Sequence, residues 1–358
     1  MQILHLTGRP HEMGEAFGES CRDQIRELYE LRLRNALAQA LRYGGRRADE
    51  AELLDLVRLC WRETEAFDPE GAAELAGIAR GAGLSRERIL AMNGLTDLRD
   101  ALAWPGQLEA VGGCTSCIAQ RDTTDAGVLY AQTWDLSTDN APFVVGVHRR
   151  PSDAPQTWSV TTVGCLSLMG LNAAGVGIGT TNLRTLDARP GVPYLSIIHR
   201  ALACSDAREA TRVVERARRA GGHSYSLVDA GGTAVVVECT AAKSRVLPIE
   251  RGTHVHCNHC LVDEHAALEG DTPQASSRAR EARMSELLAT SPGKLDPPTL
   301  QRFLADEAGG ELAIQRDDFS GISTNAAVVI DPSKPALLAC HGLPREGAWH
   351  DLVRAPEP

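Results

Sequence analysis

Two kinds of hydrophobic pattern divide the chain near residue 110. Over residues 10–100, apolar side chains recur every three or four positions, as in 25–33, which is the spacing of one buried face of an α-helix. Over residues 114–183, short apolar runs end at Gly, Asp or Pro, as is typical of β-strands separated by turns. The pattern therefore predicts an N-terminal helical lobe followed by a sheet-forming region.

The rest of the chain alternates between the two patterns. The first strands are predicted at 117–120, 128–132, 143–147 and 158–161. Helices are then predicted at 194–202 and 208–219, strands at 224–239 and 245–258, helices at 277–289 and 299–307, and strands at 326–330 and 336–340. Blocks of strands separated by pairs of helices favour an α+β protein in which stacked sheets are covered by helices.

Composition and charge exclude several classes of protein. The 358 residues are 43% hydrophobic and 23% charged, which is ordinary for a globular chain with a large core. A net charge of −10 argues against a nucleic-acid-binding surface. No apolar run is long enough to span a bilayer, and no basic segment precedes the short apolar stretch at the start, so we expect no membrane partner and a cytoplasmic location. A homo-oligomer is compatible with this composition.

The most informative short segment is Gly112-Gly113-Cys114. A thiol attacks the carbonyl group of the preceding residue only if the backbone there distorts, and glycine adopts unusual backbone angles at little cost. Once the chain is cut before Cys114, that residue carries both a thiol and a free α-amine. The amine titrates at about pH 8, so it can take the proton of its own thiol. The segment therefore predicts a nucleophile that makes itself by self-cleavage.

Several ordered motifs carry a resemblance to a known family. They are Gly113-Cys114-Thr115, Gln132-Thr133-Trp134-Asp135, residues 170–182 and Cys257-Asn258-His259, with 8–14 and 74–81 upstream. In this order they resemble the penicillin acyltransferase (acyl-coenzyme A:6-aminopenicillanic acid acyltransferase) family, peptidase family C45, whose members cut themselves. The likeness extends more distantly to bile-salt and penicillin V hydrolases.

The resemblance implies an N-terminal-nucleophile hydrolase, with an αββα four-layer sandwich. Residues 1–113 are then a helical pro-segment, cut off between Gly113 and Cys114 but retained as a small subunit, and 114–358 form the catalytic subunit. A Cys114 thioester would hydrolyse an amide or pass an acyl group to or from an amine. The expected partners are a small-molecule amide or acyl thioester and the protein's own pro-segment. No cofactor is expected, and acyl-coenzyme A enters only as an acyl-donor substrate.

The resemblance also assigns roles to individual residues. Asp135 corresponds to the acid that hydrogen-bonds the terminal amine. Asn182 and Asn258 are the candidates for the oxyanion hole, because side-chain amides donate N–H groups without carrying charge. Trp134 and Gln132 are candidate substrate-binding residues. At the position of Gln132 the bile-salt hydrolases have Arg, so no charge is carried over to it.

A late arginine completes the expected site. Arg278, in Ser276-Ser277-Arg278, resembles the family's Ser-Arg pair, whose guanidinium reaches back toward the nucleophile. The interval from Asn258 is short and the following helix is rich in arginine, so Arg280 and Arg283 are alternatives for the same role.

Two other functions compete with this interpretation. Cys114 with Cys117 and Cys257 with Cys260 form two C-x-x-C pairs, and three histidines lie near the second, as in a zinc site. However, the ligands of such a pair point to opposite faces of a strand, so we assign no metal. The alternatives are a zinc- or redox-linked binding protein that uses these pairs and an enzyme-like scaffold that never matures.

Overall fold

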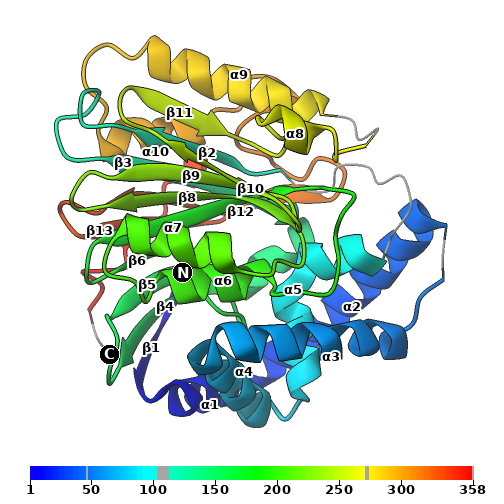
Figure 1. Ribbon diagram of the computed structural model, residues 1–358. Helices are drawn as coiled ribbons and strands as arrows, with labels where there is room; N and C mark the ends of the chain where they lie inside the picture. Colours follow the sequence, from blue (N-terminus) through cyan, green and yellow to red (C-terminus); the bar gives the residue numbers. More distant parts are fainter. Residues whose placement is uncertain (46, 103–112, 271–273, 357–358) are drawn as a thin grey trace.

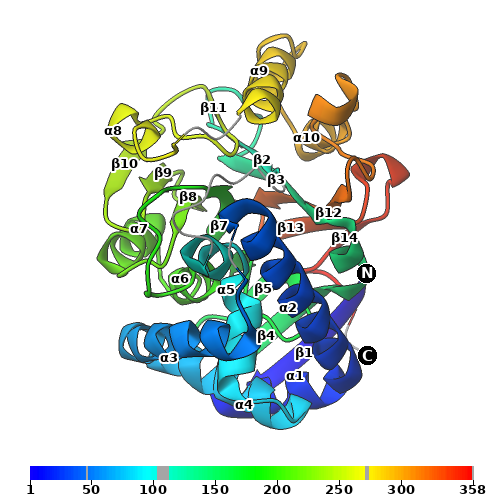
Figure 2. The same cartoon turned by 90° about the vertical axis from the view of Figure 1, so that its right-hand side faces the viewer.

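The computed structural model describes residues 1–45, 47–102, 113–270 and 274–356. Its main body has four layers, which Figure 1 shows from the side: helices α9 and α10, a first sheet, a second sheet, and helices α6 and α7. The predicted α+β class and the αββα sandwich are therefore confirmed. The helical lobe, α1 to α5, packs beside this sandwich (Figure 2).

The larger sheet, called sheet A, has eight strands within the described residues, in the order β1-β4-β5-β6-β7-β8-β9-β10. Their bounds are β1 Gln2–Gly8, β4 Val144–Pro151, β5 Thr157–Thr162, β6 Met169–Asn172, β7 Val176–Leu183, β8 Gly222–Asp229, β9 Ala234–Cys239 and β10 Ser244–Pro248. All neighbours are antiparallel except β1, which pairs in parallel with β4.

The smaller sheet, called sheet B, contains the strand that follows Cys114. Among the described residues it has six strands in the order β11-β2-β3-β12-β13-β14. Their bounds are β11 Thr253–His256, β2 Thr115–Ala119, β3 Leu129–Ser137, β12 Ile322–Asp331, β13 Ala336–His341 and β14 Trp349–Asp351. Within this sheet β2 lies between β11 and β3, and Cys114 immediately precedes it.

Helices cover the outer faces of both sheets. On sheet A lie α6 Tyr194–Ala201 and α7 Ala207–Arg216, and on sheet B lie α9 Ala275–Ala289 and α10 Pro297–Leu304. A short helix, α8 Asp263–Ala266, follows β11. The lobe consists of α1 Pro10–Ser20, α2 Arg22–Gly44, α3 Glu50–Phe67, α4 Pro69–Ala82 and α5 Arg86–Leu102, and three short 3-10 helices lie at Thr138–Phe143 (η1), Gly310–Leu312 and Pro344–Glu346.

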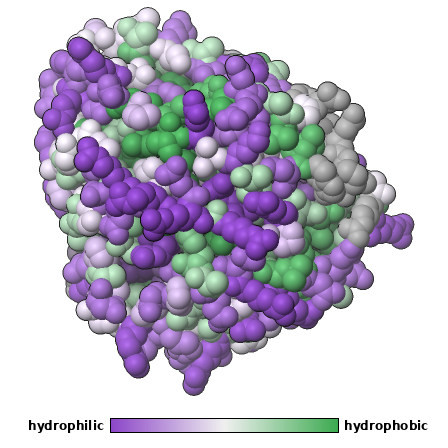
Figure 3. Space-filling model, in the orientation of Figure 1, coloured by the Kyte–Doolittle hydropathy of each residue, from purple (hydrophilic) through white to green (hydrophobic). Residues whose placement is uncertain are grey.

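Strand alternation explains why both faces of sheet B are buried. On β2, Cys117 and Ala119 join the core beneath α9 and α10, whereas Ile118 between them joins the core shared with sheet A. Successive side chains on a strand point to opposite faces, so such a strand is apolar on both. On the outer surface shown in Figure 3, hydrophilic residues predominate and the apolar patches between them are small.

The N-terminal segment differs from the prediction at its start. Residues 1–113 were expected to be helical, but Gln2–Gly8 forms β1 at the edge of sheet A. The segment was too short to show a clear period of two. It is the pairing with β4, far away in the sequence, that makes it a strand. The helices predicted between residues 10 and 100 are present as α1 to α5.

Candidate active site

Cys114 stands immediately before β2 and is 6% exposed. It lines a cavity of about 30 Å³ between the two sheets, together with Gly113 and side chains from β3, β7, β8 and α5. Burial and the negative charge of Asp135 raise the pKa of the Cys114 thiol to about 12. In the intact chain the thiol is therefore protonated at neutral pH, and any attack by sulfur needs a group that takes this proton.

Gly113 lies beside two guanidinium groups. A Cβ atom there would stand 2.9 Å from Nη2 of Arg280 and 3.1 Å from Nη1 of Arg316. Its N–H donates to the backbone carbonyl of Asp135 at 3.4 Å. Two guanidinium groups thus flank the residue whose carbonyl group would be attacked. Gly112 lies outside the described residues.

Asn258 holds the backbone nitrogen of Cys114. The Cys114 N–H donates to Oδ1 of Asn258 at 2.7 Å, and Nδ2 of Asn258 donates to the backbone carbonyl of Asn182 at 3.0 Å. An N–H needs an acceptor and a carbonyl needs a donor, so these two partners fix which way the amide points. Asn258 therefore acts as an acceptor for the backbone nitrogen of Cys114, while one N–H of its amide is used by the Asn182 carbonyl.

The arginine that reaches this point is Arg280. Its Nη2 donates to Oδ1 of Asn258 at 3.0 Å, and its Nη1 donates to the carbonyl of Cys114 and, at 3.0 Å, to the hydroxyl of Thr115. Arg278, the residue named from the sequence, is exposed on the same helix. The alternative Arg283 pairs instead with Asp306.

Asp135 lies on β3 beside Cys114, with 2% of its surface exposed. Its Oδ1 accepts a hydrogen bond from the Thr324 hydroxyl at 2.8 Å, and its Oδ2 has no hydrogen-bond partner among the described residues. Burial raises the pKa of this carboxyl group, and the charges of Arg280 and Arg316 partly oppose that effect, which leaves it at about 6. A buried carboxyl group with such a pKa can accept a proton near neutral pH.

Two of the three remaining predicted residues line the Cys114 cavity. Trp134 and Asn182 both line the Cys114 cavity, and Oδ1 of Asn182 has no hydrogen-bond partner among the described residues. Gln132 is not among the residues that line it. Its Nε2 donates to the carbonyl of Thr180 on β7 at 2.6 Å, so it joins sheet B to sheet A.

Sequence reasoning missed three residues of this site. Arg316 flanks Gly113 from the loop before β12, and Thr324 on β12 holds Asp135. Thr96 of α5 lines the cavity, so the N-terminal lobe also contributes a wall. The Arg316 N–H donates to the Thr324 hydroxyl, and the Thr324 N–H donates to the Arg316 carbonyl, so the two residues are neighbours. No local motif marks either of them.

The two C-x-x-C pairs do not form a metal centre within the described part of the chain. No group of three or more Cys, His, Asp or Glu residues there could hold a metal ion. Cys117 and Cys257 are buried in the core beneath α9 and α10, whereas Cys114 faces the cavity. Burial raises the pKa of both core thiols.

Two facing sheets between helical layers, with a buried cysteine immediately before a strand of the smaller sheet, form an αββα sandwich with a candidate nucleophile in the cavity between its sheets. The chain belongs to the acyl-coenzyme A:6-aminopenicillanic acid acyl-transferase family, whose model matches residues 123–346. The predicted family and the prediction of an acyltransferase or amidohydrolase enzyme are confirmed. The matched region includes Asp135, Asn182, Asn258 and Arg280 and begins after Cys114.

Individual relatives give the extent of the likeness. The chain is 25% identical over 318 residues to the "acyl-coenzyme A:6-aminopenicillanic-acid-acyltransferase 40 kDa form" of Emericella nidulans, covering 88% of this chain and 85% of that protein. Among solved structures, a mutant of conjugated bile acid hydrolase from Clostridium perfringens has 13% identity and a TM-score of 0.45, covering 64% of this chain and 89% of the other. Penicillin V acylase from Agrobacterium tumefaciens has 17% identity and a TM-score of 0.44, covering 67% and 86%. No helix in the described ranges is long and apolar enough to cross a membrane.

Proposed function

We propose that this protein is a self-cleaving cysteine enzyme whose mature nucleophile is Cys114. The Cys114 sulfur attacks the Gly113 carbonyl carbon, the Gly113–Cys114 C–N bond breaks, and the nitrogen leaves with a proton. Water then attacks the resulting thioester, which releases the carboxylate of Gly113 and the thiol of Cys114. Residues 1–113 become a small subunit and 114–358 the catalytic subunit.

The observation that carries this proposal is how tightly the bond before Cys114 is held. Asn258 binds the leaving nitrogen at 2.7 Å, and Arg280 donates to the next carbonyl group. Arg280 and Arg316 also place positive charge beside Gly113, with guanidinium nitrogens 2.9 and 3.1 Å from where a Cβ of that residue would lie. Donors preorganised around a developing negative charge lower the barrier more in a buried site than in water. Asp135, with a pKa of about 6, lines the same cavity as Cys114 and is suited to take the thiol proton.

The mature enzyme would use the same groups on a substrate. The new α-amine of Cys114 takes the thiol proton, sulfur attacks an acyl carbonyl group, and the amine or thiol of the substrate leaves with a proton. Water then yields hydrolysis, whereas an acceptor amine yields acyl transfer. Asn182 lines the cavity in which the oxyanion develops, and its side-chain amide supplies the N–H donors. Asn258 would hold the nitrogen of Cys114, which is a backbone amide in the intact chain and a terminal amine after cleavage. The relative named above is an acyl-coenzyme A acyltransferase, so acyl thioesters and small amides are the substrate classes to test first.

The test is the intact mass of the purified protein over time. Self-cleavage predicts fragments of about 12 and 26 kDa from the 38.4 kDa chain, in proportion to 113 and 245 of its 358 residues, with the larger fragment beginning at Cys114. Cys114→Ala should remain a single chain. Arg280→Ala should slow cleavage by about 10²-fold or more, because it removes positive charge beside Gly113 and the donor to the Cys114 carbonyl.

Arg278→Ala supplies the matched control, because it removes the same side chain from an exposed position of the same helix. It should cleave at the wild-type rate. A wild-type chain that stays uncut after long incubation, or equal slowing by both arginine variants, would contradict the proposed site.

A further inference from the structure

A cavity of about 380 Å³ lies at the boundary between the N-terminal segment and the rest of the chain. It is called the α4–α6 cavity here. One wall comes from α1, the end of α3 and the start of α4, and the other comes from β4, β5, the turn between them and α6. It shares no lining residue with the Cys114 cavity, so it is a separate site. In a chain cut before Cys114, each fragment would supply one wall.

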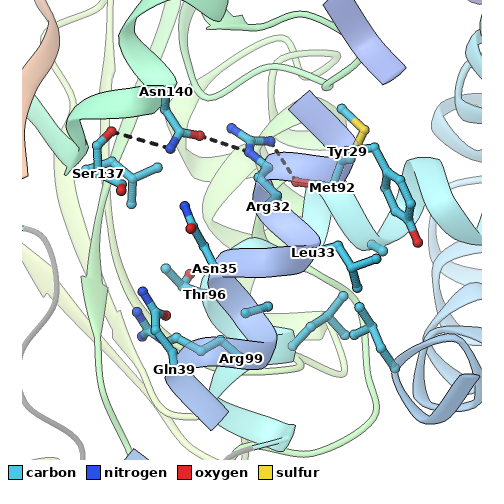
Figure 4. A pocket seen from close by; sticks show the side chains of 15 residues that line it. Tyr29, Arg32, Leu33, Asn35, Gln39, Met92, Thr96, Arg99, Ser137 and Asn140 are labelled. Atoms are coloured by element: carbon cyan, nitrogen blue, oxygen red, sulfur yellow. Dashed lines mark hydrogen bonds between the residues drawn. The ribbon is translucent and has the colours of Figure 1, made fainter. Parts of the chain in front are cut away.

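The pocket in Figure 4 is of a different kind. It measures about 60 Å³, lies between α2, α5 and the end of β3, and shares Thr96 and Leu136 with the Cys114 cavity. The guanidinium group of Arg32 is turned toward Asn140 there and donates to it at 3.1 Å (Figure 4). That pocket belongs to the active site, whereas the α4–α6 cavity does not.

The wall from the N-terminal segment has two carboxylate oxygens without partners. Asp68 is 3% exposed, and its Oδ2 accepts no hydrogen bond among the described residues. Glu74 accepts from Arg149 through Oε1 at 2.8 Å, but its Oε2 has no partner there either. Oε2 stands 3.5 Å from Nε2 of His199, and burial lowers the pKa of that imidazole, so it is neutral at pH 7. This wall therefore offers two buried acceptors that lack donors.

The opposite wall has two donors without partners. Arg149 on β4 and Thr157 on β5 are paired across the two strands, so their side chains lie on the same face of sheet A. Both are buried, and neither Nη2 of Arg149 nor the Thr157 hydroxyl makes a hydrogen bond within the described ranges. A buried polar group without a partner costs free energy, which a complementary ligand would recover.

The balance of charge decides what such a ligand carries. Glu74 and Arg149 neutralise each other, which leaves the buried Asp68 carboxylate without an ion pair in the described part of the chain. One positive charge beside Asp68 would balance the site, whereas a carboxylate beside Arg149 would add an unbalanced negative charge. No group of side chains among the described residues could hold a metal ion, which favours an organic cation.

Apolar side chains complete the cavity. They surround the polar groups on both walls and include Met13, Phe67, Pro69, Pro151, Ala154 and Ala203. Apolar walls with a few placed polar groups are typical of small-molecule sites. The occupant therefore combines a cationic donor and a neutral acceptor with an apolar side chain.

We propose that the α4–α6 cavity binds a small primary ammonium compound with a neutral carbonyl group and an apolar side chain, as in an amino-acid amide. The ammonium group donates to Asp68 and Glu74, and the carbonyl oxygen accepts from Arg149 and Thr157. One ligand would thus contact both segments that cleavage before Cys114 separates. The inference goes beyond the proposed function and does not depend on it, because no contact involves Cys114.

The test is isothermal titration of L-leucinamide into the full-length Cys114→Ala chain at pH 7, where turnover by Cys114 is excluded. The α-amine titrates at about pH 8, so it is mostly protonated under these conditions. N-acetyl-leucinamide, which lacks the ammonium group, and leucine, which carries a carboxylate, should each bind at least about tenfold more weakly. 3-Methylbutylamine, which lacks the carbonyl group, should bind about three- to tenfold more weakly.

Two nearly isosteric variants locate the site. Asp68→Asn should weaken leucinamide binding by at least about tenfold, and Thr157→Val by about three- to tenfold. Because the Thr157 hydroxyl has no partner in the fold, its loss should not lower stability, which urea unfolding checks. Glu70→Gln is the matched control, since it removes the same charge from an exposed residue of the same cavity, and it should weaken binding by at most about threefold.

Several outcomes would overturn the inference. The first is that leucinamide does not bind, and the second is that Asp68→Asn and Glu70→Gln weaken it equally, which would indicate general attraction to an acidic surface. Leucine binding more tightly than leucinamide would overturn the neutral carbonyl group, and N-acetyl-leucinamide binding as tightly would overturn the ammonium group. None of these results depends on self-cleavage, so they leave the proposed function to its own test.

Discussion

On the residue scale, Asp135 is subject to two opposing effects. Burial between the sheets disfavours its charged form, while the guanidinium groups of Arg280 and Arg316 favour it. Burial is the stronger effect, so the pKa of the carboxyl group rises from an ordinary value of 3.8 to about 6. The result is a base that is charged at neutral pH yet holds a proton more strongly than an exposed aspartate does.

This pKa predicts the pH dependence of self-cleavage. If Asp135 takes the proton of Cys114, the cleavage rate should rise as pH increases through about 6, where the carboxyl group ionises, and level off above it. Below that pH the carboxylic acid cannot accept the proton. The rate is measured by intact mass at a series of pH values, and Asp135→Asn should lower it by about 10²-fold or more. A wild-type profile without a step between pH 5 and 7 would assign the proton transfer to another group.

The arginine of the site shows how far a motif can predict a residue. Ser276-Ser277-Arg278 lies on the helix that also carries Arg280, and its two serines contact the candidate site: Ser277 accepts from the Asn258 N–H and Ser276 from Arg316. Which arginine faces inward depends on the register of that helix. Ser277, Arg280, Met284 and Leu288 share its buried face, at spacings of three and four, and Arg278 lies outside it. That register is set by packing against sheet B, which the sequence motif does not contain.

On the element scale, a buried carboxylate joins β9 to the segment after β11. Glu238 on β9 is fully buried, and each of its oxygens accepts two donors. Oε2 accepts from His256 at 3.1 Å and the Leu261 N–H at 2.7 Å, and Oε1 from His265 at 2.9 Å and the Val262 N–H at 3.1 Å. These contacts lower the pKa of Glu238 to about 2. They hold residues 256–265, which come before α9, the helix that carries Arg280.

Glu238→Gln should therefore destabilise the fold. An amide can accept at one end only, so its NH₂ group would face two donors. The carboxyl pKa falls from 4.5 to about 2 on folding, so the charged form contributes about 3 kcal/mol above pH 4.5, at about 1.4 kcal/mol per unit, and loses it as pH falls toward 2. Urea unfolding in the uncleaved Cys114→Ala background should show this loss at pH 7 and a smaller difference at pH 3. The exposed Glu250→Gln is the control, and an equal effect of both variants would contradict the role.

The elements themselves were predictable to different degrees. The helices of the lobe and most strands of both sheets follow from local periodicity, because each buries one face or both. The predicted strand at 245–258 is two strands in different sheets, since β10 pairs with β9 and β11 pairs with β2. Arg316 was not predictable, because its place beside Gly113 depends on how β12 inserts between β3 and β13. The position of Arg316 is therefore set by strand pairing between segments far apart in the sequence, and not by the hydrophobic pattern around it.

On the scale of the whole molecule, the N-terminal segment is part of the folded body before any cut. Its first strand continues sheet A through β4, from the pair Gln2 and Val145 to the pair Gly8 and Pro151. Glu74 on α4 forms an ion pair with Arg149 on β4 at 2.8 Å, with at most 2% of either side chain exposed. Its helices also wall the pocket beside Cys114. Cleavage before Cys114 would therefore leave a small subunit held by a strand and a buried charge pair.

The ion pair should govern how firmly that subunit is retained. In Glu74→Ala, the Arg149 guanidinium would keep only the hydroxyl groups of Ser159 and Ser167, and a buried charge without its partner costs about 3–5 kcal/mol. We expect the two fragments of this variant to separate at clearly lower urea than those of the wild type, as followed by size-exclusion chromatography.

Glu63→Ala is the matched control, because Glu63 also pairs across the same boundary, with Arg218 at 2.9 Å, but at the surface. An exposed pair contributes about 0–1 kcal/mol, so this variant should behave nearly as the wild type does. The double variant Glu74→Met with Arg149→Met should retain the small subunit better than Glu74→Ala, since apolar side chains of similar volume leave no unpaired charge. If Glu74→Ala and Glu63→Ala release the fragment at the same urea concentration, the buried pair is not what holds the subunit, and the β1–β4 pairing would have to carry that role.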